Sequence, residues 1–181
     1  SLAVVQAVTR LTLADHTSDD VLHRLEQRIS ALASAHDILI KNEWRGAGFE
    51  ALARQQLAAY MDNAEQQLKL SGPAVILPPE IATPLGLVLH ELATNAAKYG
   101  ALRSPTGNVS LIWEIRDLEG GLRLLDMTWT ESGGPHVDPP TKKGAGSTLI
   151  EHGLARAEVE RRYEPTGLIC RIKVPLTPAS A

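Results

Sequence analysis

One segment of this chain places an acid, an amide and a cation in a single column. Glu91, Asn95 and Lys98 stand at i, i+4 and i+7 of a segment with helical periodicity, so their side chains share one face. A carboxylate, an amide oxygen and an ammonium group can together serve a magnesium ion and its phosphates. The opposite side carries the apolar residues expected to face a core: Leu85, Val88, Leu89 and Leu92. For this segment alone, the alternative is an amphipathic helix with a solvated polar face.

A second acid, Glu131, stands at the end of a predicted strand. Leu125, Met127, Trp129 and Glu131 share one face by their two-residue spacing. Because Leu125 and Met127 must face the core, Glu131 emerges over the layer that helices cover. It can accept a hydrogen bond from a ligand amine there, and Gly133 lets backbone approach a flat ring closely. An ordinary strand-end carboxylate is the alternative.

A glycine-rich segment, Gly144-Ala145-Gly146-Ser147, opens a helix that we predict over residues 148–159. Backbone N–H groups at such a helix start can hold phosphate oxygens, although this spacing is also common in ordinary turns. The chain has no G-x-x-x-x-G-K-[ST] loop, which excludes a Walker-type nucleotide site. A dinucleotide-binding fingerprint is also excluded, because Gly144 does not follow a strand within a parallel βαβ unit.

Two helical segments are predicted at the N-terminal end. Residues 2–14 keep apolar residues on one side, and Ser18 fits the N-cap of a longer second helix. In this second helix, residues recur at spacings of three and four along a seam typical of helix–helix packing: Leu22, Leu25, Ile29, Leu32, His36 and Leu39. The first segment is the obvious partner in a helical hairpin. For His36, a hydrogen-bonded core histidine is favoured over a phosphate acceptor or a metal ligand.

The rest of the chain predicts a mixed α/β unit. Residues 42–48 break the helical periodicity and mark a boundary. The elements predicted after it are a helix over 49–61, a strand over 74–77, the Glu91 helix opened by Pro78 and Pro79, a hairpin over 109–116 and 122–130, and a last hairpin around 164–167. We therefore expect an α+β chain: a helical hairpin (1–46), an α/β sandwich with a mixed, largely antiparallel sheet (47–176), and a loose tail (177–181).

Composition narrows the class of protein. Of 181 residues, 44% are hydrophobic and 22% charged, which is typical of a globular core. The net charge of −3, without a cluster of basic and aromatic residues, gives no support to nucleic-acid binding. The single cysteine, Cys170, cannot form an internal disulfide and suits a reducing, cytoplasmic compartment. No apolar run approaches the roughly 18 residues of a membrane span.

Taken in order, these motifs resemble the catalytic part of HWE-type sensor histidine kinases, within the ATPase superfamily shared with gyrase and Hsp90. The letters of that name are matched by His90 and by Trp129 and Glu131 as W-x-E. HELATNAAKYGAL resembles the family's N box, WTESGGP stands where related kinases carry D-x-G-x-G, and GAGSTLIE resembles the following glycine box. Residues 35–39, with Trp44, resemble the family's hairpin and linker.

The resemblance implies a protein-histidine kinase that uses ATP and Mg²⁺. By it, Asn95 would supply an oxygen to magnesium, Glu91 would act near the metal-bound waters or as a base, and Lys98 would contact phosphate. Glu131 would bind the adenine amino group, and His90 would orient Glu91 or touch the nucleotide. The same resemblance places five more residues around the nucleotide: Tyr99 of the N box, Gly133 after the W-x-E strand, and Gly144, Gly146 and Ser147 of the glycine box.

The implied activity moves the γ-phosphoryl group of ATP to a histidine, and then to an aspartate in a response-regulator receiver domain. In the family, the accepting histidine begins an H-R-V-K-N stretch directly ahead of a segment like residues 1–5, so we expect the acceptor outside this fragment. The helical hairpin can also form a homodimer. The alternative is a degenerate, non-catalytic phosphotransfer or scaffold protein of the same fold. An ATP-hydrolysing machine like gyrase has less support.

Overall fold

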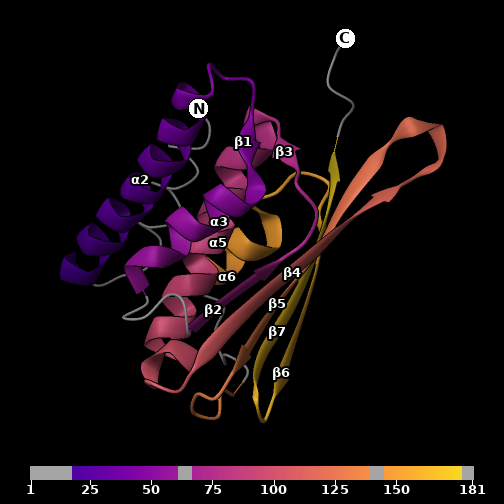
Figure 1. The fold of residues 1–181 in the computed structure, drawn as a ribbon. Coiled ribbons are helices and arrows are strands. Elements are labelled where there is room, and N and C mark those ends of the chain that lie inside the picture. Colours follow the sequence, from indigo (N-terminus) through magenta and orange to yellow (C-terminus); the bar gives the residue numbers. More distant parts are fainter. Residues whose placement is uncertain (1–17, 61–66, 139–144, 177–181) are drawn as a thin grey trace.

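A computed structural model describes residues 18–60, 67–138 and 145–176 of the chain (Figure 1). Its helices are α2 (Ser18–Lys41), α3 (Phe49–Leu57), α5 (Pro79–Lys98) and α6 (Ala145–His152), with 3-10 turns η1 (Ala58–Tyr60), η2 (Ala101–Arg103) and η3 (Glu119–Gly121). Its strands are β1 (Ala47–Gly48), β2 (Leu68–Ser71), β3 (Ile76–Leu77), β4 (Asn108–Asp117), β5 (Arg123–Ser132), β6 (Glu158–Glu164) and β7 (Gly167–Leu176). None of the helices in these ranges combines the length and apolar character needed to span a bilayer.

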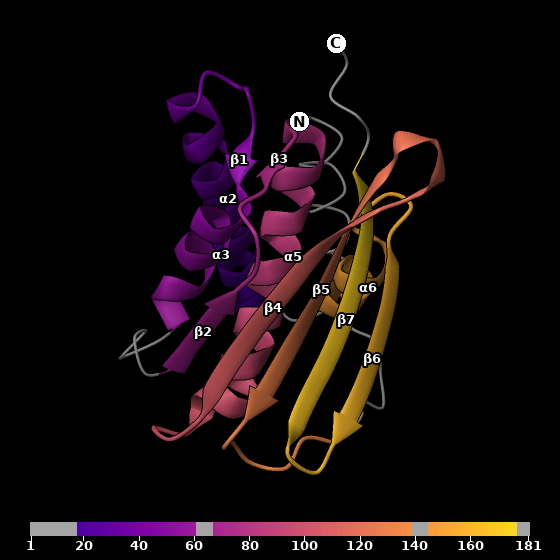
Figure 2. The same cartoon turned by 45° about the vertical axis from the view of Figure 1, so that its right-hand side comes forward.

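The sheet has the strand order β2-β4-β5-β7-β6. β2 runs parallel to β4, and the other neighbouring pairs are antiparallel. Helices cover one face of this sheet (Figure 2). Helix α5 lies along its middle, α3 lies beside α5 with Phe49 packed against Trp113 of β4, and α2 contacts α3 and α5 from outside. The predicted α+β class with a mixed, largely antiparallel sheet is therefore confirmed. β1 and β3 form a separate two-stranded ladder.

The core lies between α5 and the covered face of the sheet. The predicted alternation of β5 is confirmed, because Leu125, Met127, Trp129 and Glu131 are all buried. The predicted apolar side of α5 is buried as well, including Leu85 and the other three residues on that side. On β7, Cys170 is fully buried, and this burial raises the pKa of its thiol to about 12. It alternates along β7 with buried Leu168, Ile172 and Val174, so it is a small core residue.

Helix α2 buries only part of its predicted seam. Leu32 and Leu39 are buried, whereas Leu22 and Ile29 are 62% and 49% exposed. The buried face points instead toward α3 and α5, which α2 contacts. His36 is half-buried and meets the Trp44 ring edge-on at a centroid distance of 5.7 Å. The predicted partner helix over residues 2–14 and the predicted tail after residue 176 lie outside the described residues.

Several predicted elements differ from the structure. The helix predicted over 49–61 ends at Leu57 and is followed by the 3-10 turn η1. The helix predicted over 148–159 is too long, since α6 ends at His152 and Glu158 begins β6. The helix stops because Gly153 follows it, with its N–H bonded to the Leu149 carbonyl, and the next segment alternates with the strand period. Sequence reasoning also missed β2, which has only four residues and therefore too few positions to display an alternation.

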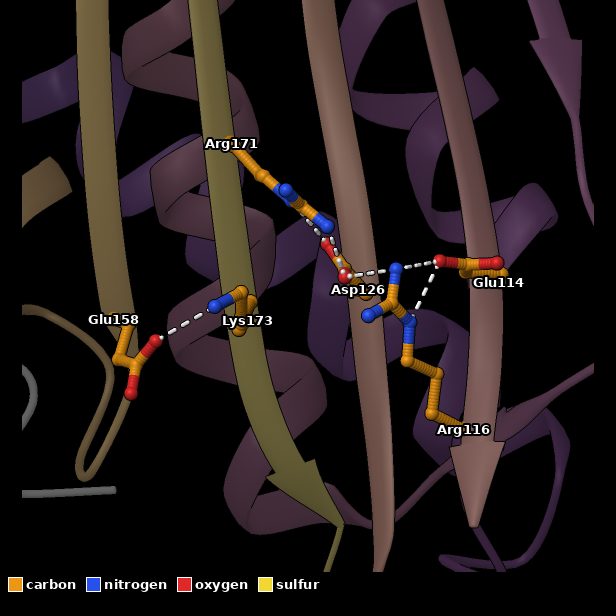
Figure 3. A network of polar contacts seen from close by, with 6 residues as sticks. All are labelled: Glu114, Arg116, Asp126, Glu158, Arg171 and Lys173. Carbon is orange, nitrogen blue, oxygen red and sulfur yellow. Dashed lines mark hydrogen bonds and ion pairs between the residues drawn. The ribbon is translucent and has the colours of Figure 1, made fainter. Parts of the chain in front are cut away.

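The uncovered face of the sheet carries a chain of charged side chains across four strands (Figure 3). Asp126 is only 4% exposed and accepts two bonds from the Arg171 guanidinium, of 2.8 and 2.7 Å. Arg116 lies 3.0 Å from the same carboxylate and also bonds Glu114. The hydrogen bonds from Arg171 hold the pKa of Asp126 below its ordinary value, with a further contribution from the charge of Arg116.

We expect Asp126→Asn to destabilise the fold in a pH-dependent way. A carboxyl whose folded pKa is lowered stabilises the protein above its unfolded pKa, and that stabilisation is lost as the pH falls through the folded pKa. Losing charge-assisted bonds should lower the free energy of unfolding by about 2 kcal/mol at pH 7. Urea unfolding should show this difference shrinking toward pH 3. Glu114→Gln, at a 57% exposed side chain, is the control with little effect. A deficit that stays constant with pH would contradict the electrostatic explanation.

Candidate active site

A cavity of about 550 Å³ lies where α2, α5, α6 and the ends of β5 and β6 meet. This volume is within the range of small-molecule sites. Most of the residues that the sequence predicted for a site line it: His90, Glu91, Asn95, Lys98, Tyr99, Glu131, Gly146 and Ser147. Segments far apart in the sequence, the N box, the W-x-E strand end and the glycine box, thus share one cavity.

One predicted residue, Gly133, is not among the residues that line this cavity. Gly133 has a φ of +74° and packs against Thr106, whose carbonyl oxygen would be 2.6 Å from an added Cβ. The turn therefore requires glycine at position 133, whatever role the residue has toward a ligand. Another predicted residue, Gly144, lies outside the described residues. The described part of the glycine box begins with the first turn of α6.

The polar column on α5 runs from buried to open. Glu91 is buried, Asn95 is half-buried and Lys98 is exposed, and all three face the cavity. Helix α5 ends directly after them, where the Asn95 carbonyl accepts bonds from the N–H groups of Tyr99 and Gly100. The site thus offers a carboxylate at depth and a cation near the opening.

Glu91 is held by an ion pair rather than by solvent. The Arg28 Nε of α2 donates to Glu91 Oε1 at 2.6 Å, and the two side chains are 3% and 8% exposed. The other carboxylate oxygen faces α6, because a Cβ at Gly146 would lie 2.3 Å from Glu91 Oε2. The alternative interpretation of a solvated polar face is therefore wrong for Glu91, the first residue of the column. Three helices converge on one carboxylate.

His90 belongs to a small network of neutral hydrogen bonds. The Tyr60 hydroxyl lies 3.2 and 3.3 Å from the two ring nitrogens of His90, and the Thr94 hydroxyl donates to Tyr60 Oη at 3.0 Å. Burial lowers the pKa of His90, against the opposing charge of Glu91, so its imidazole is neutral near pH 7. Burial also raises the pKa of Tyr60. This arrangement fixes the direction of the His90 ring without adding a charge to the cavity.

Glu131 is 2% exposed, and both of its oxygens already have donors. The Trp129 indole donates to Oε1 at 3.0 Å and the Ala101 backbone N–H donates to Oε2 at 3.0 Å. Burial raises the pKa of Glu131, while these two hydrogen bonds oppose the rise. Each oxygen keeps a second lone pair. A ligand amine entering the cavity would therefore meet a carboxylate already fixed in direction.

Sequence reasoning missed the contribution of α2. Arg24, Gln27 and Arg28 line the cavity, yet the helix was interpreted only as part of a hairpin. One signal was present: Arg28 shares a helical face with the buried residues Ala31 and Leu32, so a cation interrupts an apolar stripe. Further cations at the cavity, Arg103 of η2 and Arg161 of β6, had no such pattern.

Comparison with known proteins gives matches over nearly the whole chain. Residues 1–74 match the family model described as HWE histidine kinase. A blue-light-activated histidine kinase of Brucella anthropi is 34% identical over 181 residues, covering 98% of this chain and 37% of that protein. The protein of the same name from Brucella ovis is 33% identical over 182 residues, with the same coverage. The chain thus spans little more than a third of the length of these relatives.

Solved structures share the fold. The histidine kinase domain of a blue-light activated histidine kinase from Erythrobacter litoralis superposes with a TM-score of 0.56 at 19% identity, covering 97% of this chain and 96% of that one. A longer structure of the Erythrobacter protein gives a TM-score of 0.63 at 20% identity, covering 97% of this chain and 58% of that one. The family-model match over residues 1–74 and the 34% identity to the Brucella anthropi protein show that the chain belongs to the HWE histidine kinase family.

Proposed function

We propose that this chain is the ATP-binding region of a sensor histidine kinase and that its cavity binds Mg²⁺-ATP. The observation that carries the proposal is the meeting of Glu91, Asn95 and Lys98 with Glu131 in one cavity. A triphosphate needs cations and a metal with oxygen ligands, and an adenine needs an acceptor for its amino group. The α5 column supplies the cation and the oxygen ligands for a metal, and Glu131 at the end of β5 supplies the acceptor for the amino group.

The residues present fit such a ligand. Asn95 and Glu91 offer the oxygens that magnesium prefers, and magnesium keeps most of its waters, so a small set is sufficient. When bound, the metal ion would neutralise charge on the phosphates. Lys98 and the first turn of α6, with Gly146 and Ser147, would contact phosphate oxygens. His90, neutral and held by Tyr60, would keep its ring fixed against the cavity wall.

The proposed reaction is transfer of the γ-phosphoryl group of ATP to a histidine nitrogen, followed by transfer to a response-regulator aspartate. The chain's part is alignment and charge neutralisation, which dominate phosphoryl-transfer catalysis. A receiver domain is the proposed partner, and the hairpin that includes α2 is the proposed dimerisation element. Cys170, the only cysteine, is buried as a free thiol, which fits the cytoplasmic location that we propose.

The alternative is a degenerate, non-catalytic phosphotransfer or scaffold protein of this fold. It would not need an acid at both ends of the cavity, whereas this chain keeps Glu91 and Glu131 buried at considerable electrostatic cost. Buried acids that face a cavity favour the binding function, because such groups cluster at functional sites.

A nucleotide titration followed by thermal melting separates the two. We expect the melting temperature to rise with the concentration of a non-hydrolysable ATP analogue in the presence of Mg²⁺, since a ligand that binds only the folded state stabilises it. The rise should be smaller with EDTA and smaller with a GTP analogue. An unchanged melting temperature at millimolar analogue would favour the scaffold.

A further inference from the structure

Helix α2 forms a wall of the cavity although it lies outside the ATP-binding unit predicted from the sequence. Arg24, Gln27 and Arg28 project from it into the same space that Asn95 and Lys98 line from α5. In Figure 2, α2 lies on the far side of α5 from the sheet. A helix of the predicted hairpin thus reaches the proposed nucleotide site through its side chains.

The contact that matters most is the ion pair between Arg28 and Glu91. Its N–O distance is 2.6 Å, and both side chains are almost completely buried. A buried ion pair is seldom a strong source of net stability, because desolvation of both charges offsets their attraction. Its stronger effect is geometric, since a charge-assisted bond to the planar guanidinium fixes the direction of the carboxylate.

The position of α2 sets where Arg28 lies. Ala35, two turns further along α2, packs against Gly86 of α5, where an added Cβ would be 3.3 Å from the Ala35 Cβ. The Gln56 side chain of α3 donates to the Ala31 carbonyl at 3.1 Å. These close contacts seat α2 on α3 and α5. Rotating or sliding α2 on this seat would carry the Arg28 guanidinium away from Glu91.

We propose that Arg28 is a positioning residue for the Mg²⁺-nucleotide, acting through Glu91. It holds the Glu91 carboxylate in the cavity wall beside Gly146, where that carboxylate can accept hydrogen bonds from metal-bound water. The position of α2 would thereby control the Mg²⁺-dependent part of the nucleotide affinity. This inference rests on the proposed function and assigns a residue of the hairpin to the same site.

The test compares Arg28→Met and Arg28→Lys in the full chain. Calorimetry measures the affinity for the non-hydrolysable analogue AMPPNP with Mg²⁺ and with EDTA. We expect Arg28→Met to lose Mg²⁺-dependent affinity by roughly 10- to 100-fold, the range for partners that orient a metal site, while the affinity in EDTA changes little. Arg28→Lys should recover most of the loss, because it restores a cation beside Glu91.

Arg54→Met is the matched control, because Arg54 pairs with Glu50 on the exposed side of α3, with side chains more than half exposed. It should bind as the native chain does. If Arg28→Met folds and keeps the native metal dependence, or binds the Mg²⁺ complex more tightly, the positioning role is wrong. If neither Arg28 variant folds, the residue is structural and the proposal is equally wrong. A native chain that binds no AMPPNP would instead overturn the proposed function.

Discussion

Replacing Asn95 with alanine should abolish the Mg²⁺-dependent part of nucleotide binding. Asn95 is the half-buried member of the α5 column, between buried Glu91 and exposed Lys98, and its carboxamide faces the cavity. Removing a direct oxygen ligand should cost more than the roughly 100-fold that the loss of an outer-shell partner can reach. Calorimetry with AMPPNP, with and without Mg²⁺, isolates this effect.

The fold should survive this substitution, which makes the result easy to interpret. Alanine favours a helix more than asparagine does, so the melting temperature without ligand should hold or rise. Asn95→Asp is the matched variant, because it keeps a hard oxygen ligand in nearly the same volume and should retain metal-dependent binding. Unchanged affinity in Asn95→Ala would show that the metal has other ligands, and Glu91 would become the first candidate.

The sequence predicted those parts of the site that have a regular period. The helical period places Glu91, Asn95 and Lys98 on one face, and the strand period places Trp129 and Glu131 on one face. Once one residue of an element is known to be buried, the period gives the direction of the other side chains. The sheet class followed from the same alternation. Both the fold class and the buried face of β5 could be predicted because they depend on local periodicity and on no contact between distant residues.

Two features that the sequence did not reveal depend on tertiary contacts. Arg28 pairs with Glu91, which is 63 residues away in the sequence. No local pattern in α2 predicts this pairing. Tyr60 meets His90 from a 3-10 turn where a regular helix was expected, so its distance from α5 could not be derived. The end of α6 failed for a local reason: the stop at Gly153 was outweighed by an apolar periodicity that continued past it.

The Glu131 carboxylate also explains why a tryptophan stands two residues before it. Residues i and i+2 of a strand point to the same side, so the Trp129 indole N–H can reach Glu131 Oε1 at 3.0 Å. Trp129 is 1% exposed, and this bond satisfies its only donor. The pair W-x-E therefore works as one unit, in which the indole fixes the direction of the acid.

We therefore expect Glu131→Ala to lose discrimination between ATP and GTP. A carboxylate attracts the amino group of adenine and repels the carbonyl oxygen that guanine presents at the same position, so it works both for one base and against the other. The loss should be on the order of 10- to 100-fold in the affinity ratio, the value of one or two charged hydrogen bonds. Competition between the two nucleotide analogues measures the ratio directly.

Trp129→Phe separates the direction of the carboxylate from its presence. It removes one N–H donor and keeps an aromatic ring in the core, so Glu131 remains but is less constrained. Its loss of discrimination should be smaller than that of Glu131→Ala. Trp113→Phe is the matched control, because that indole donates to the Pro73 carbonyl at 2.9 Å and does not line the cavity. If Glu131→Ala still prefers the adenine nucleotide as strongly as the native chain, adenine is recognised elsewhere in the cavity, and Trp129 has no part in the choice of base.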